Sequence, residues 1–405
     1  MVSGGPRRWP SGFWLGAALV AALAACSSPE RLPSVPAADT TRAQPLGIPY
    51  ARFYPGTQAD QMIEVGTQAA MRRLVAQGLM EPGGPPPKTL PPVDFLAVSG
   101  GGDDGAFGAG LIVGWTEHGD RPDFQIVTGV STGALIAPYA YLGPDYDAQL
   151  REVYTTISPD KIFVERGLLG IYYKDSIADT TPLWEMISAH VDEQMLADIA
   201  RAYEGGRLLL IGTTNLDAQR PVIWNIGAIA ASGHPDALDL VRKILRASSA
   251  VPGVFQPVLI DVEIDGQKYQ ELHVDGGAIA QMFVYPPNID LRQQIHRERA
   301  AYLIRNARQD AKWAEVEPRT LSIAGRAIST MIHASGTNDI LRIYFIMQRD
   351  GVDYNLAYIG SDFSAPHVAD FDTPYMVALF DYGYQQGRAG YDWKKSPPGL
   401  AAAGN

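Results

Sequence analysis

Short apolar runs alternate with longer helical patterns along the middle of the chain. The run at residues 93–99 (VDFLAVS) has the length of a buried strand, and residues 105–118 (GAFGAGLIVGWTEH) follow it as a helix. The same pair recurs at residues 124–128 (FQIVT) and 132–142 (TGALIAPYAYL). Further strands are expected at 208–211 and 221–225, and a helix at 238–248. This alternation predicts an α/β fold in three layers, α/β/α, around a mainly parallel central sheet.

Beyond Asn288 the pattern predicts helices over residues 292–306, 320–333 and 375–393. Residues 341–348 and 352–359 alternate in polarity on either side of Asp350-Gly351, which is typical of a β-hairpin with an Asp-Gly turn. No Pro/Gly-rich linker separates this region from the strands before it. We therefore expect it to complete a single domain over residues 93–395.

The N-terminal residues have the pattern of an export signal. A basic start at Arg7 and Arg8 precedes 12 apolar residues, 13–24, which are too few to span a bilayer. The sequence Leu-Ala-Ala-Cys at 23–26 resembles the lipobox of bacterial lipoproteins, in which the cysteine is lipidated. We expect a signal peptide over 1–25, a lipidated Cys26, a flexible tether over 26–57, and a helix with a Pro/Gly linker over 58–92. The lipobox resemblance, with Ser27 next, implies an anchor in the outer membrane.

Charge and composition exclude several classes of function. The formal net charge of −11 and the lack of a Lys/Arg cluster argue against a nucleic-acid partner. The chain has one cysteine, Cys26, so no intrachain disulfide can form. No His/Cys/Asp/Glu group has the spacing of metal ligands, so we expect no metal and no cofactor. The oligomeric state is not determined by any of these features.

A nucleophile motif lies at a strand end. Residues 129–133 (GVSTG) match G-x-S-x-G, in which a sharp strand-to-helix turn exposes the serine hydroxyl. Gly129 and Gly133 leave room where chain segments crowd. A strand is predicted before the motif and a helix after it, which is the context that the motif requires. Ser131 is therefore the candidate nucleophile.

A glycine-rich loop, residues 99–105 (SGGGDDG), follows another strand. Consecutive glycines let backbone N–H groups approach a substrate closely, and the next helix adds the positive end of its dipole. A nucleotide P-loop is disfavoured, because no Lys follows and two carboxylates lie where an anion would bind. The partial match of Gly100, Gly102 and Gly105 to G-x-G-x-x-G is a weak signal. The serine motif favours an oxyanion loop instead.

The base that would take the proton of Ser131 is either a histidine or an aspartate. By chain order alone His333 or His367 would complete a Ser-acid-His triad, but neither lies in a Gly-bounded turn at a strand end. Asp275 does, in residues 272–277 (LHVDGG). A carboxylate in hydrogen-bond reach of the serine suffices as a base if burial raises its pKa.

These three motifs, in this order, resemble the patatin-like phospholipase family over about residues 93–287. The segment at 247–258 (ASSAVPGVFQPV) also resembles the family's segment before the aspartate strand. The resemblance implies a Ser-Asp dyad of Ser131 and Asp275, and an oxyanion loop of Gly100, Gly101 and Gly102. The supporting glycines are Gly105, Gly129, Gly133, Gly276 and Gly277.

The resemblance also implies a serine lipid acyl hydrolase acting on a lipid or ester substrate. Two alternatives are a non-catalytic lipoprotein that binds lipid or envelope partners, and an acyltransferase on the same fold. The chain departs from the family at Asp104, where Lys or Arg is usual. Asp103 and Asp104 suit the first turn of a helix as capping residues. The missing cation would otherwise weaken recognition of anionic head groups, in which case Asp104→Arg raises activity on anionic phospholipids relative to neutral esters.

Overall fold

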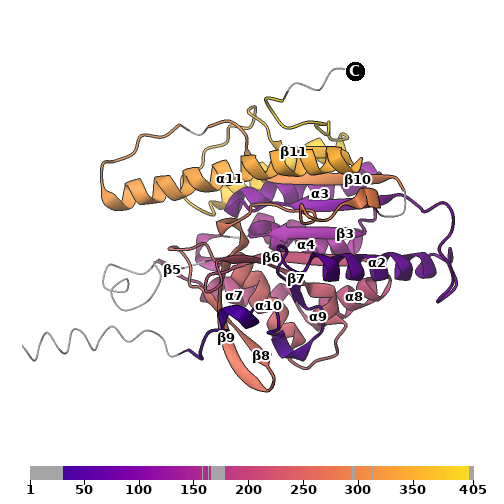
Figure 1. Ribbon diagram of the computed structural model, residues 1–405. Coiled ribbons are helices and arrows are strands. Elements are labelled where there is room, and N and C mark those ends of the chain that lie inside the picture. The colour runs from indigo at the N-terminus through magenta and orange to yellow at the C-terminus, as the bar shows by residue number, and fades with distance from the viewer. Residues whose placement is uncertain are drawn as a thin grey trace, which may run out of the picture.

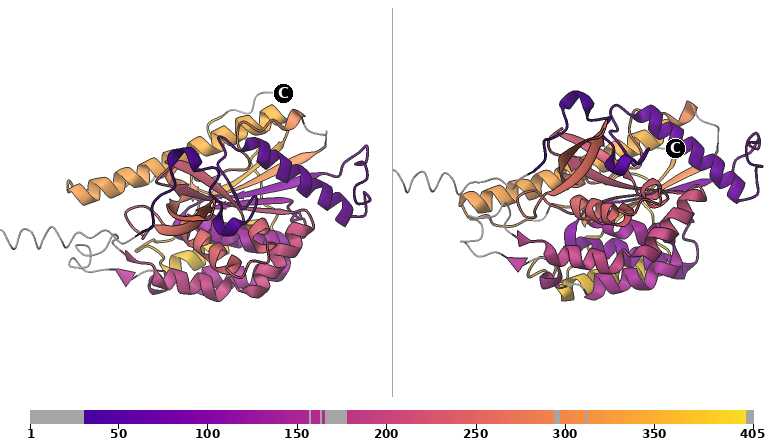
Figure 2. Two further views of the ribbon diagram at one scale, coloured as in Figure 1. Left: turned by 60° about the horizontal axis from the view of Figure 1, so that its bottom comes forward. Right: turned by 90° about the horizontal axis from the view of Figure 1, so that it is seen from below.

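The computed structural model describes residues 31–156, 158–162, 164–165, 178–293, 297–311 and 313–400. A nine-stranded sheet runs through the centre of the molecule, with helices on both of its faces (Figures 1 and 2). Its main path has the order β1-β7-β6-β3-β2-β10-β11, and β9 pairs with β6 and carries β8. The strands are β1 (Arg52–Phe53), β2 (Val93–Val98), β3 (Ile126–Val130), β6 (Leu208–Asn215), β7 (Arg220–Asn225), β8 (Val258–Ile264), β9 (Gln267–Asp275), β10 (Arg299–Arg308) and β11 (Asp353–Ile359).

Five neighbouring strands, β6, β3, β2, β10 and β11, are mutually parallel. The strands on the other side of β6 are antiparallel to their neighbours. A separate two-stranded sheet joins β4 (Val164–Glu165) to β5 (Ala178–Asp179). The predicted α/β fold in three layers is confirmed, with a mixed sheet whose central strands are parallel.

Two helices cover one face of the sheet and the others cover the opposite face (Figure 2). On the first face lie α2 (Ala59–Ala76) and α11 (Thr320–Asp350). The remaining helices are α3 (Gly105–His118), α4 (Thr132–Leu142), α5 (Asp147–Thr156), α7 (Thr181–His190), α8 (Glu193–Glu204), α9 (Ile226–Ala230), α10 (Ala237–Ser248) and α12 (Thr373–Arg388).

Alternation along the strands divides the core between these two faces. In β2, Phe95 and Ala97 pack beneath α11, while Leu96 and Val98 join the larger core around α3 and α4. A strand with apolar residues on both sides must be covered on both faces, because either face left open would expose apolar surface to water. This explains why the strand runs are nearly continuous in hydrophobicity.

The local predictions in the middle of the chain are confirmed. The helices predicted at 105–118 and 132–142 coincide with α3 and α4, and the strand at 93–99 is β2. The predictions beyond Asn288 are partly wrong. Residues 299–308 form strand β10 instead of a helix, and the expected hairpin is absent because residues 341–348 belong to the 31-residue helix α11. β11 then pairs in parallel with β10, so this region extends the same sheet.

The expectation of a flexible tether over 26–57 is wrong for its described part, residues 31–57. This segment lies against the body, where β1 pairs with β7 and Gln44 pairs with Glu263 of β8. Phe53 is buried with Val65 of α2 and Leu208 of β6. Proline and serine content therefore did not prevent a packed structure. The expected signal peptide over 1–25 and Cys26 lie outside the described residues.

Within the described ranges, no helix is both long enough and apolar enough to cross a bilayer.

Candidate active site

Ser131 lies in the turn between β3 and α4, with a backbone φ of 56° and ψ of −128°. A non-glycine residue in this region is strained, and such strain persists only where the surroundings enforce it. The flanking glycines explain how the chain tolerates the turn. A Cβ on Gly129 would lie 2.4 Å from the Gly133 carbonyl oxygen, and a Cβ on Gly133 would lie 2.2 Å from the Val98 carbonyl oxygen. The predicted nucleophile elbow is thus present.

Two serines at the end of α10 hold the elbow in place. The Ser131 N–H donates to Ser248 Oγ over 3.0 Å, and Ser248 Oγ donates in turn to the Gly212 carbonyl over 2.7 Å. Ser249 Oγ lies 3.4 Å from the Ser131 carbonyl oxygen. Sequence reasoning did not assign roles to these serines, because Ser131, with which both interact, is more than 100 residues away in the chain.

The register of β6 brings Asp275 to Ser131. Val130, the last residue of β3, pairs with Gly212, and Asp275, the last residue of β9, pairs with Thr213. Gly212 and Thr213 are consecutive, so two strands that run in opposite directions end against each other along one edge of β6. Ser131, the candidate nucleophile, follows one of these ends, and Asp275 forms the other.

Asp275 is buried, with 4% of its surface exposed. Burial raises the pKa of its carboxyl to about 7, against the lowering effect of hydrogen bonds from the Ser131 hydroxyl and the Gly277 N–H. The Gly277 N–H donates to Asp275 Oδ1 over 2.6 Å. Gly276 and Gly277 permit this turn, since a Cβ on Gly276 would lie 2.6 Å from the Gly212 carbonyl oxygen. The carboxyl is therefore poised to exchange a proton near neutral pH.

The glycine-rich loop passes directly beside Ser131. A Cβ on Gly100 would lie 3.1 Å from Ser131 Cβ, and one on Gly101 would lie 2.1 Å from the Asn306 carbonyl oxygen. Gly102 has a φ of 61°, which favours glycine. The Gly100 N–H donates to the Gln281 carbonyl over 3.1 Å, so in this structure that N–H already has an acceptor, unlike the expectation that it serves an oxyanion. Within the described residues, no acceptor is recorded for the N–H groups of Gly101 and Gly102.

Three side chains that sequence reasoning missed support this loop. Asn306 Nδ2 donates to the Ser99 carbonyl over 2.9 Å, and Arg305 Nη1 donates to the Gly100 carbonyl over 3.2 Å. Gln281 Nε2 donates to the Gly277 carbonyl over 2.9 Å, which links the loop to the Asp275 turn. Burial lowers the pKa of Arg305 to about 10, so it remains a cation at neutral pH. β10 thus supplies a positive charge behind the loop, although Asp104 replaces the usual cation within it.

The capping roles expected of the two aspartates are not observed. Asp104 occupies the N-cap position of α3 but its side chain makes no capping hydrogen bond; it accepts a hydrogen bond from the Tyr375 hydroxyl of α12 instead. Asp103 Oδ2 accepts from the Phe371 N–H over 2.8 Å and lies 2.7 Å from His367 Nε2. These acids fasten the C-terminal part of the chain to the loop.

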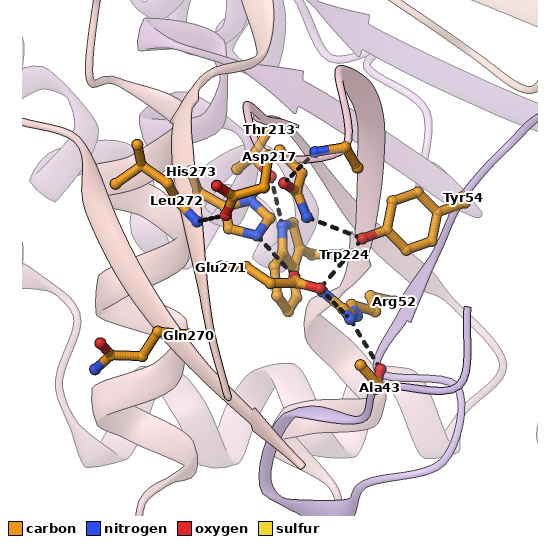
Figure 3. A network of polar contacts seen from close by, with 12 residues as sticks. Ala43, Arg52, Tyr54, Thr213, Asp217, Trp224, Gln270, Glu271, Leu272 and His273 are labelled. Carbon is orange, nitrogen blue, oxygen red and sulfur yellow. Dashed lines mark hydrogen bonds and ion pairs between the residues drawn. The ribbon is translucent and has the colours of Figure 1, made fainter. Parts of the chain in front are cut away.

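Neither histidine considered from the sequence is recorded in contact with Ser131. His367 contacts Asp103 and His333 lies in α11. The side chains recorded as hydrogen-bond partners of Ser131 among the described residues are those of Ser248, Ser249 and Asp275. His273 is buried two residues before Asp275, where its ring nitrogens contact Thr213 and Glu271 (Figure 3). Burial lowers the pKa of His273, which favours the neutral ring. Within the described residues no cluster of three or more His, Cys, Asp or Glu residues has metal-binding geometry.

The chain was compared with family models, curated sequences and solved structures. Residues 96–286 match the family model described as Patatin-like phospholipase. One similar solved structure is VipD from Legionella pneumophila, at 13% identity and a TM-score of 0.37; the match covers 77% of this chain and 69% of that one. Another is human GIVD cytosolic phospholipase A2, at 9% identity and a TM-score of 0.27, with 64% of this chain covered. The chain spans 49% of the length of the human protein. No curated protein sequence matches it.

Proposed function

We propose that this chain, whose residues 96–286 match the patatin-like phospholipase family model, is a serine lipid acyl hydrolase with a Ser131-Asp275 dyad. Members of that family are generally ester hydrolases. A phospholipid or a simple ester of a fatty acid is the class of substrate. No cofactor is needed for this chemistry, because the nucleophile, the base and the oxyanion donors all come from the chain.

In the proposed reaction, Ser131 Oγ attacks the ester carbonyl carbon and the Asp275 carboxylate takes the hydroxyl proton. The carbonyl oxygen becomes an oxyanion, which the N–H groups of Gly101 and Gly102 stabilise; one such donor is worth roughly 3–4 kcal/mol of barrier. The leaving alkoxide takes the proton back from Asp275 and departs. Asp275 then takes a proton from water, and the resulting hydroxide attacks the acyl carbon. The bond from this carbon to Ser131 Oγ breaks, Asp275 returns the proton to Ser131 Oγ, and the fatty acid leaves.

One observation carries this proposal. A buried carboxyl with a pKa of about 7 accepts a hydrogen bond from a serine held in a strained turn. An unperturbed aspartate would be too weak a base near neutral pH, since its usual pKa is about 3.9. Burial raises the pKa of Asp275 into the neutral range, where its carboxylate is a stronger base. A shifted pKa beside a strained serine is typical of catalytic sites.

We predict that Ser131→Ala and Asp275→Asn each lower kcat/KM for a short-chain p-nitrophenyl ester by about 10³-fold or more, because either change removes an indispensable member of the dyad. His333→Ala and His367→Gln serve as matched controls and are expected to retain most of the activity. The measurement is steady-state hydrolysis by purified variants with native near-UV circular dichroism. A histidine variant as inactive as Ser131→Ala would contradict the dyad and restore a triad.

A fluorophosphonate probe tests the chemistry independently of the substrate. The wild-type chain is expected to be labelled at Ser131, and Ser131→Ala is expected to remain unlabelled. A folded wild-type sample that resists labelling would favour the alternative of a lipid-binding protein without turnover. Cys26 as the lipidated residue, with an anchor in the outer membrane, is also a proposal; the sequence pattern at 23–26 supports it.

A further inference from the structure

Helix α11 has two halves with different surroundings. Its C-terminal half packs on the sheet through Ile340, Ile343 and Met347. Its N-terminal half extends beyond the rest of the molecule and projects from it in all three views (Figures 1 and 2). Residues 320–335 of this half have a length of roughly 24 Å at 1.5 Å per residue.

The projecting half carries an apolar stripe, which we define as Ile323, Ala324, Ala327, Ile328 and Met331. Positions 323, 327 and 331 are four residues apart, and 324 and 328 lie beside them, so all five share one side of the helix. Ile323, Ile328 and Met331 are 52%, 41% and 62% exposed. The other side is polar, with Ser322, Arg326 and Ser329. A helix with this division normally buries its apolar side against a partner.

The stripe lies at the active-site end of the sheet. α11 connects the parallel strands β10 and β11, so it begins at the carboxyl end of β10, which is the end where Ser131 follows β3. Further along the helix, Asp339 Oδ2 accepts a hydrogen bond from the Gln281 N–H over 2.6 Å. Gln281 is the residue that links the glycine loop to the Asp275 turn. The helix that carries the stripe therefore also contacts the residue that links the two turns of the proposed catalytic site.

Other exposed apolar side chains lie on segments that border the site. Ile279 follows the Gly276-Gly277 turn and is 40% exposed. Val368 is 80% exposed and adjoins His367, which contacts Asp103 of the glycine loop. Val254 is 43% exposed and lies in the segment whose Ala250 carbonyl accepts the Asp275 N–H. We call these three residues the apolar rim. Each of these segments is tied by a hydrogen bond or a turn to the Asp275 turn or the glycine loop, and exposed apolar groups beside such a site are typical of a surface that binds a partner.

We propose that the stripe and the rim dock this protein on a lipid surface with zwitterionic head groups. The inference rests on the proposed function, because the ester bonds of membrane lipids lie just below the head groups, where the mouth of the site must reach them. An amphipathic helix inserts its apolar side into that boundary region. The net charge of −11 disfavours attraction to an anionic surface, so apolar burial supplies the binding energy.

A single-cysteine dye experiment tests this docking. Cys26 is the one cysteine, so the full chain with Cys26→Ser accepts a new cysteine at a chosen position. We attach the environment-sensitive dye NBD to Ile323→Cys or Met331→Cys and add phosphatidylcholine vesicles. Insertion of the stripe should raise the emission at least about twofold with a blue shift, because the dye leaves water for an apolar medium.

Two control positions make the result specific. Ser329→Cys lies on the polar side of the same helix, and Leu79→Cys carries an equally exposed residue beyond α2, away from the site. Both should show little change with vesicles. Equal emission changes at all four positions, or no change at the stripe, would overturn the proposal. A change without vesicles that grows with protein concentration would assign the stripe to a second copy of the chain and also overturn it.

The docking and the proposed function fail in distinguishable ways. Hydrolysis of a soluble short-chain ester by the wild-type chain needs no lipid surface and tests the catalytic site alone. A chain that cleaves this ester but whose stripe shows no emission change has the proposed function without the docking surface. A chain whose stripe responds but which cleaves no ester lacks the proposed activity.

Discussion

At the scale of single residues, the central fact is the environment of one carboxyl. Asp275 ends β9 in a buried position, and this burial raises its pKa to about 7. In the proposed reaction this group must be ionised to take a proton from Ser131, so we expect the fraction of active protein to depend on pH in the neutral range.

We predict that kcat/KM for a soluble ester rises with pH through about 7 and levels off above it, because the Asp275 carboxylate forms over that interval. The measurement is a pH profile after subtraction of spontaneous hydrolysis. Near-UV circular dichroism across the same range is the control for unfolding. A profile that is already flat at pH 5 would contradict the raised pKa.

The residue scale also shows what local sequence can reveal. Ser131 and Asp275 were predicted because each lies in a short motif whose geometry is set by adjacent glycines. Gln281, Asn306 and Ser248 were not, because nothing within a few residues marks them. Their roles come from partners elsewhere in the fold, such as the Ser99 carbonyl that Asn306 binds.

At the scale of elements, the pairing of α3 with α12 depends on backbone contact. The two helices pack through Gly110 and Gly114 of α3 and Gly383 and Gly387 of α12. A Cβ on Gly110 would lie 2.0 Å from the Phe380 carbonyl oxygen. This pairing matters for the site, because α3 begins at the glycine loop and α12 supplies the Tyr375 hydroxyl to Asp104.

We predict that Gly110→Ala lowers the free energy of unfolding by about 1–3 kcal/mol or more, because the methyl group must force two backbones apart. Gly325→Ala is the matched control; it lies in α11 with nothing within 4 Å of its Cβ. That change should be neutral or stabilise by up to about 1 kcal/mol through helix propensity. Urea denaturation of both variants gives the comparison. An unaffected Gly110→Ala variant would show that the helices are not in close contact.

The misassigned hairpin also belongs to this scale. The eight residues at 341–348 satisfy a strand pattern by alternation, but Ile340, Ile343 and Met347 are buried with a helical spacing of three and four. A short apolar run fits both patterns, and only the wider window separates them. The Asp-Gly pair, expected as a hairpin turn, ends the helix instead, with Gly351 in the left-handed region at a φ of 64°.

At the scale of the whole molecule, the N-terminal segment closes over the strand that carries Asp275. Arg52 of β1 forms a buried ion pair with Glu271 of β9, and its second nitrogen donates to the Ala43 carbonyl over 2.9 Å (Figure 3). Burial alone would raise the pKa of Glu271, but the charge of Arg52 and the hydrogen bonds from His273 and Arg52 hold it well below its usual range. His273 lies two positions after Glu271, and Asp275 lies two positions after His273.

We predict that Arg52→Met destabilises the protein by about 3–5 kcal/mol, because it leaves the Glu271 charge buried without its partner. The double variant Arg52→Met/Glu271→Leu should recover part of that loss. Arg42→Met, which breaks an exposed ion pair with Asp265, is the control and should leave the free energy of unfolding nearly unchanged, because solvent screens exposed charges. Urea unfolding measures all three. A double variant no more stable than the single one would contradict the electrostatic origin of the loss.

The sequence by itself determined the layered α/β architecture and marked Ser131 and Asp275 as the candidate nucleophile and base, because strand and helix periods and glycine-bounded turns are local properties. Tertiary structure decided what depends on residues far apart in the chain. Residues 31–57 lie on the body partly through the ion pair of Arg52 with Glu271, which are 219 residues apart in sequence. The cation that contacts the glycine loop is Arg305, which comes from a distant strand. Tertiary structure also gave Asp275 its raised pKa, because burial depends on the packing of the whole molecule and not on the residues beside it.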